Sequence, residues 1–111
     1  MPDGEQTSGC RQQTELKVLL KTAKAPADHL KIAAYYKQEA ARLAQSAKEH
    51  SQLAAIYQQH PFNAALEAKH GSAVEGVSHC RRWAELASEQ AKEAEALAAL
   101  HEGMAKAAEQ K

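Results

Sequence analysis

The chain has 111 residues, enough for one domain, and 44% of them are hydrophobic, although aromatic residues make up only 5%. Its 14 lysines and arginines balance 14 aspartates and glutamates, so there is no excess charge of one sign to attract nucleic acid or an anionic membrane. No apolar run reaches the roughly 18 residues of a transmembrane helix, and two cysteines are too few for a disulfide framework.

Residues 1–24 read as a flexible leader that holds a short helix. The first 13 residues are polar and contain no apolar stretch of the kind found in signal peptides. We therefore expect a cytoplasmic chain, or a periplasmic one if an export signal has been removed. A short helix is expected from about Thr14, because three leucines share one face there: Leu16, Leu19 and Leu20.

A long helix is expected to begin near Pro26 and to end before Pro61. Proline is favoured in the first helical turn because it has no N–H to leave unbonded, and Asp28 suits the positive end of the helix dipole. Pro61 would stop the helix, since proline cannot donate the next backbone hydrogen bond.

A second long helix is expected after the polar segment that follows Pro61. The sequence "SAVE" places Ser72 three residues before Glu75, the spacing of a capping box, and the helix should continue to about Glu109. Residues 25–111 are thus predicted to form one all-α domain, a long antiparallel helical hairpin.

A seven-residue repeat gives each long helix one packing face. In the first helix the repeat comprises His29, Tyr36, Leu43, His50 and Tyr57, and alanines follow four positions later at Ala33, Ala40, Ala47 and Ala54. In the second helix it comprises Cys80, Ala87, Ala94 and His101. Two helices leave much apolar surface uncovered, so we expect two chains to associate as a four-helix bundle, a homodimer.

If the chain folds back at about residue 65, facing positions have numbers that add to about 130. Large residues then face small ones, as close packing requires; the pairs are Tyr36 with Ala94, Leu43 with Ala87, and Tyr57 with Ala73. The six histidines fall in three layers, namely His29 with His101, His50 with Cys80 and the adjacent His79, and His60 with His70.

Facing imidazoles suit a transition metal, because neutral imidazole binds zinc and copper and a thiolate binds zinc or cuprous copper. His29 and His101 would form one partial site, with Met104 one turn beyond. A second partial site would combine the ligands His50, His79 and Cys80. A dimer would double the ligands at each site. A haem held between two histidines is a less favoured interpretation, since no covalent attachment motif is present.

Two metal-free interpretations compete with this one. The histidines could simply cap helix ends or hydrogen-bond to neighbours inside a structural or protein-interaction module. The long helices could also lie on a lipid or polymer surface. An enzyme is not expected: adjacent His79 and Cys80 diverge on a helix, and no oxyanion donors or orienting acid accompany them.

The segments "APADHLKIAAYYKQEAARLA", "KEHSQLAAIY" and "SHCRRWAELASEQAKEAEALAALHEGMA" resemble a group of small alanine-rich bacterial helical-hairpin proteins whose function is unassigned. The resemblance covers most of residues 24–107. It implies that the positions matching the histidines and the cysteine of those proteins are His29, His50, His79, Cys80 and His101. It also implies that a periplasmic location is plausible, because members often carry an export signal. It implies no activity.

Overall fold

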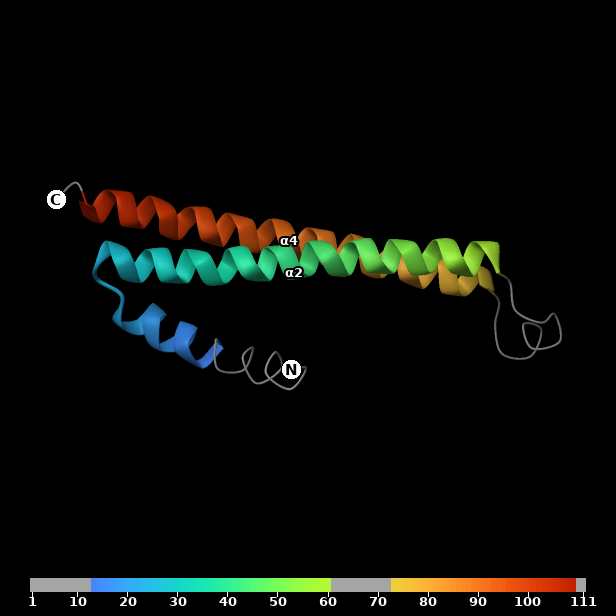
Figure 1. The fold of residues 1–111 in the computed structure, drawn as a ribbon, viewed down its shortest axis with the longest axis horizontal. Coiled ribbons are helices and arrows are strands. Elements are labelled where there is room, and N and C mark those ends of the chain that lie inside the picture. The colour runs from blue at the N-terminus through green and yellow to red at the C-terminus, as the bar shows by residue number, and fades with distance from the viewer. Residues whose placement is uncertain (1–12, 61–72, 110–111) are drawn as a thin grey trace. The chain divides into compact units, whose positions relative to one another are not determined.

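The computed structural model describes residues 13–60 and 73–109, and within them every regular element is a helix (Figure 1). A short helix occupies 13–22. Helix α2 spans Pro26–Gln59 and helix α4 spans Ala73–Glu109. The three helices expected from the sequence are confirmed in type and position, while Ser72, the expected cap of α4, lies outside the described residues.

The start of α2 follows from three residues. Ala25 accepts backbone hydrogen bonds from the N–H groups of Asp28 and His29, and Pro26 takes the first helical position. The backbone N–H of Ala25 in turn donates to Oδ2 of Asp28 at 3.3 Å. This is the acidic half of a capping box, in which the carboxylate of the third helical residue accepts a hydrogen bond from the N–H of the residue that precedes the helix.

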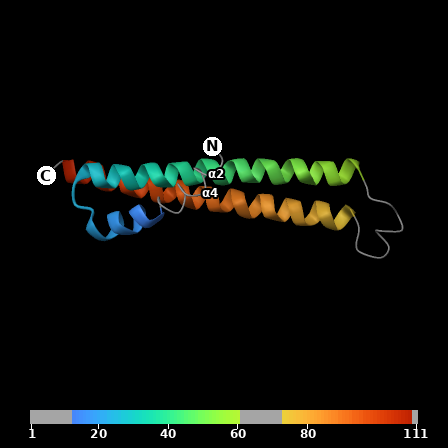
Figure 2. The ribbon, with the colours of Figure 1, turned by 60° about the horizontal axis from the view of Figure 1, so that its bottom comes forward.

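The chain divides into two compact units. The first combines Met1–Glu39 with Ala94–Lys111, and the second consists of Ala40–Glu93. Within each unit a segment of α2 runs antiparallel beside a segment of α4, and Figure 2 shows the same pairing from another side. The expected fold-back of one long helix on the other is therefore supported within each unit.

Small side chains form almost the whole core of the described residues. Those buried in the first unit are Ile32, Ala33, Ala94, Ala98, Ala105 and the polar His101; in the second they are Ala40, Ala54, Ala84, Ala87 and Ala91. Ile32 is the one large side chain among them that is completely buried. Alanine seams let two helices approach closely but bury little apolar area per residue.

Many large apolar side chains lie outside this core. The exposed ones among the described residues are Val18, Leu20, Leu30, Leu53, Ile56, Val74, Trp83, Leu86, Leu97, Leu100 and Met104. A single chain thus buries mainly small residues and leaves many large apolar side chains exposed to water. This arrangement favours association with another molecule.

The close approach of the helices makes one glycine position sensitive. A methyl group built on Gly76 would lie 2.6 Å from Cδ1 of Tyr57, whereas one built on Gly103 meets nothing within 4 Å. We expect Gly76→Ala to lower the free energy of unfolding by about 1 kcal/mol or more, because the overlap outweighs the gain in helix propensity.

Gly103→Ala is the matched control in the same helix. Relief of glycine's poor helix propensity should raise the free energy of unfolding by about 1 kcal/mol. Urea unfolding followed by circular dichroism measures both changes. Equal effects of the two substitutions would show that α4 does not pack against Tyr57 as described.

Candidate functional site

The first unit brings together two histidines that are 72 positions apart. His29 lies in the first turns of α2, and His101 lies in the last third of α4. Nδ1 of His29 is 3.1 Å from Nδ1 of His101. His29 is half-buried, and His101, only 7% exposed, is the one buried polar residue in the described part of the chain. The pairing expected from the sequence is confirmed.

The two imidazoles meet edge to edge. Their planes are inclined by 21° and their centres are 5.4 Å apart. Each ring atom lies about 1.1 Å from the centre of its ring. If both Nδ1 atoms lay on the line that joins the two ring centres, the observed N–N distance would put those centres about 5.3 Å apart. The observed value matches this limit, and the Nδ1 atoms therefore point almost directly at each other.

This alignment limits the protonation states of the pair. One Nδ1 must carry a hydrogen and donate it, while the other must present a lone pair. Burial, and secondly the charge that His29 carries when protonated, lower the pKa of His101 from its ordinary value of 6.5. The pair is thus built to contain at least one neutral imidazole.

A tyrosine completes the immediate surroundings of the pair. The ring centre of Tyr36 lies 6.1 Å from that of His101, with an angle of 23° between the planes. On the exposed side, Nζ of Lys37 lies 3.3 Å from Oε1 of Glu102. The sequence placed Tyr36 opposite Ala94 and did not assign it to the histidine layer, although its position seven residues after His29 put both on one face.

The second unit places His50 against an aromatic ring. The centres of His50 and Trp83 are 4.0 Å apart and their planes are inclined by 16°, a face-to-face stack. Nδ1 of His50 is buried and has no hydrogen-bond partner among the described residues. The expected neighbour was Cys80, three residues earlier in α4, so the contact differs from the simple register by nearly one helical turn.

The other two predicted ligands of this unit lie nearby in sequence but differ in exposure. His79 is exposed, and Cys80 is half-buried with a free thiol. Among residues 13–60 and 73–109, no three His, Cys, Asp or Glu side chains gather closely enough to hold a metal ion. His50, His79 and Cys80 are thus not gathered into a three-ligand group there, whereas His29 and His101 are brought together as a pair.

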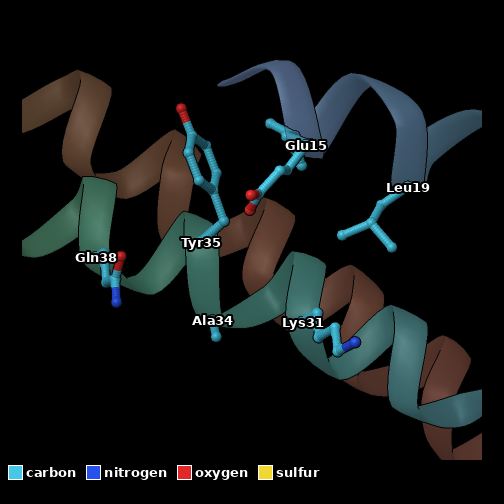
Figure 3. A pocket seen from close by; sticks show the side chains of 7 residues that line it. Glu15, Leu19, Lys31, Ala34, Tyr35 and Gln38 are labelled. Carbon is cyan, nitrogen blue, oxygen red and sulfur yellow. The ribbon is translucent and has the colours of Figure 1, made fainter. Parts of the chain in front are cut away.

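A shallow hollow lies between the 13–22 helix and α2, within the first unit. Figure 3 shows Glu15 and Leu19 reaching from the short helix, with Tyr35 of α2 beside Glu15; Lys31 of α2 also lines the hollow. Leu16 and Leu19 are half-buried, which explains how this short helix is held against α2. The sequence predicted the helix but gave no signal for its position.

Comparisons of the chain with protein-family models, with curated proteins and with solved structures find no match. In the part of the chain that the structure describes, neither long helix contains a stretch apolar enough to cross a bilayer.

Proposed function

We propose that this chain is a non-enzymatic helical protein that binds a transition-metal ion, zinc or copper, through Nδ1 of His29 and Nδ1 of His101. We further propose that it works as a homodimer, a four-helix bundle in which the second copy or water supplies the remaining ligands. The resemblance to small bacterial hairpin proteins is compatible with this function but adds no support to it.

The observation that carries the proposal is the aligned Nδ1 pair at 3.1 Å. Zinc–nitrogen bonds are about 2.0–2.1 Å long, so two imidazoles bound at a tetrahedral angle have nitrogens about 3.3 Å apart. The metal-free pair is within a few tenths of an ångström of that separation. For one metal ion to be bound by both nitrogens, each ring would turn by about 35°, so that the two lone pairs converge on a point beside the Nδ1–Nδ1 line.

Metal entry would change the tautomer of one histidine. A ligand nitrogen must present its lone pair, so the imidazole that donates in the hydrogen bond would move its proton from Nδ1 to Nε2. The accepting imidazole already presents its lone pair. The exchange needs no buried charge on either ring, which suits a site that disfavours protonated His101.

The proposal is tested by calorimetric titration of chelator-free protein with zinc and, separately, with copper. We expect the wild type to bind metal, and the double variant His29→Ala with His101→Ala to bind it more than about 100-fold more weakly. That loss is larger than the one caused by removing a group that only hydrogen-bonds to a metal ligand. His60→Ala is the matched control, because His60 is exposed beyond the end of α2. Equal binding by the wild type and the double variant would refute the site.

We also propose His50, His79 and Cys80 as candidate ligands of a second ion. Trp83, the single tryptophan, stacks on His50 and would report that event, since bound copper(II) quenches a neighbouring indole. His50→Ala should remove most of the quenching, while His60→Ala should leave it intact. Quenching that persists in the His50 variant would exclude His50 as a ligand.

A metal-free interaction module is the second candidate function, and the exposed apolar residues favour it. A surface that keeps Trp83 at 59% exposure next to other apolar side chains is typical of a protein-binding face. In that case the His29 and His101 substitutions would leave association unchanged, and no metal would bind.

A further inference from the structure

The second unit carries an apolar patch on one side of its helix pair. Its members, here called the Trp83 patch, are Leu53, Ile56, Trp83 and Leu86, each at least 43% exposed. The stack of His50 on Trp83 fixes their common side, because Leu53 follows His50 by one turn of α2 and Leu86 follows Trp83 by one turn of α4. Ile56 extends the patch by a further turn.

The thin core of this unit explains why the patch needs a permanent cover. Every buried hydrophobic residue among the described residues of the second unit is an alanine, so these residues remove little apolar surface from water. The large apolar side chains Leu53, Ile56, Trp83 and Leu86 remain exposed. If the fold needs these side chains to be covered, the partner that covers them must be present whenever the chain is synthesised. A second copy of the same chain always meets that condition.

Charges along α4 show how a second copy would fit. Arg82 and His79 lie about one and two turns before Leu86, and Glu89 and Glu93 lie about one and two turns after it; all four are exposed. An antiparallel copy related by a twofold axis through Leu86 sets Arg82 opposite Glu89 and His79 opposite Glu93, twice each. Both pairs have their midpoint within half a residue of Leu86. A twofold interface must be self-complementary in this way.

We propose that a second copy docks on the Trp83 patch, with the two α4 helices antiparallel and Leu86 at the twofold axis. This interface rests on the homodimer of the proposed function but needs no metal. Leu86 packs on its counterpart, Trp83 lies against Gln90 of the other copy, and one Arg82–Glu89 pair on each side of the axis sets the register. The other face of the helix pair, where Arg81 donates a 3.3 Å hydrogen bond to Gln58, stays in water.

Analytical ultracentrifugation of the full chain at several concentrations tests the interface. We expect a wild-type dimer. Leu86→Glu places two carboxylates together at the axis and should weaken dimerisation by more than about 100-fold. Ser88→Glu adds the same charge to the same helix at an exposed position on the opposite face, and should leave the dimer intact.

Charge reversal keeps the test decisive if the Leu86 variant fails to fold. Arg82→Glu alone, or Glu89→Arg alone, should weaken the dimer about tenfold, because two exposed ion pairs become repulsive. Their combination should restore the wild-type affinity. Reversals that have no effect, or a double variant no better than the singles, would overturn the assigned register.

The outcomes separate this inference from the metal proposal. A dimer that responds to these substitutions but binds no zinc or copper leaves the interface intact and removes the metal function. A chain that binds metal through His29 and His101 while staying monomeric overturns the interface alone. Binding of wild-type monomer to neutral phosphatidylcholine vesicles, lost in Leu86→Glu, would instead assign the patch to a lipid surface.

Discussion

Ile32→Ala is expected to lower the free energy of unfolding by about 3 kcal/mol, a typical cost of truncating a fully buried isoleucine. Ile32 has no exposed surface and is the largest fully buried side chain of the described residues. The other buried hydrophobic residues described in the first unit are alanines, which cannot extend into the space that the lost atoms leave. The cavity should therefore remain open, and the loss should lie well above that of an average substitution.

Two substitutions calibrate this effect. Ile32→Val removes a single methylene and should cost about 1 kcal/mol. Leu30→Ala, two residues earlier in the same helix, removes a side chain that is about half exposed, and should cost less than about 1 kcal/mol. Urea unfolding followed by circular dichroism measures all three. Equal losses for Ile32→Ala and Leu30→Ala would show that Ile32 does not occupy the core.

The helices were predictable because their signals are local. Proline in the first turn, a carboxylate three residues in, and an apolar repeat determine where α2 begins, and Asp28 bonds the backbone as that pattern requires. The end of α4 near Glu109 likewise matched its repeat. Such features act within a few residues of each other, so no knowledge of distant contacts was needed.

The tertiary contacts were predictable only in part, because a seven-residue register takes no account of the crossing angle of the helices or of the direction of the side chains. The pairing of His29 with His101 was found from the register, yet the same register set His50 against Cys80 and the structure sets it against Trp83. Ile32 was missed as the core's main residue, since it adjoins the repeat and does not belong to it. Large side chains point back toward the N-terminus of their helix, which shifts the actual contact by up to a turn.

The histidine pair also helps to explain how an alanine seam finds one register. Alanines pack almost equally well after a shift of one turn, so they specify alignment weakly. A shift of one turn would separate His29 from His101 and leave a buried imidazole without its partner, a loss that the alanines cannot offset. A single buried polar contact can thus select the alignment, as buried polar residues do in coiled coils.

Acidification from about pH 7.5 to about pH 5 is expected to destabilise the metal-free chain. The pKa of His101 is lower in the folded state than its ordinary value of 6.5, so the unfolded chain binds more protons in the window just below 6.5. The free energy of unfolding therefore falls as the pH drops through 6.5 to the folded pKa, and the loss is complete below it. A doubly protonated pair would also lose its hydrogen bond and repel.

His101→Gln should remove most of this loss, because glutamine is neutral at every pH and can still hydrogen-bond to His29. The groups nearest the pair, Tyr36 and the Lys37–Glu102 ion pair, are the same in this variant and in the wild type. His60→Gln, at an exposed position, is the matched control and should keep the wild-type pH dependence. Urea unfolding at both pH values measures the differences. If the His101 and His60 variants lost equal stability on acidification, the pH dependence would originate outside the His29–His101 pair.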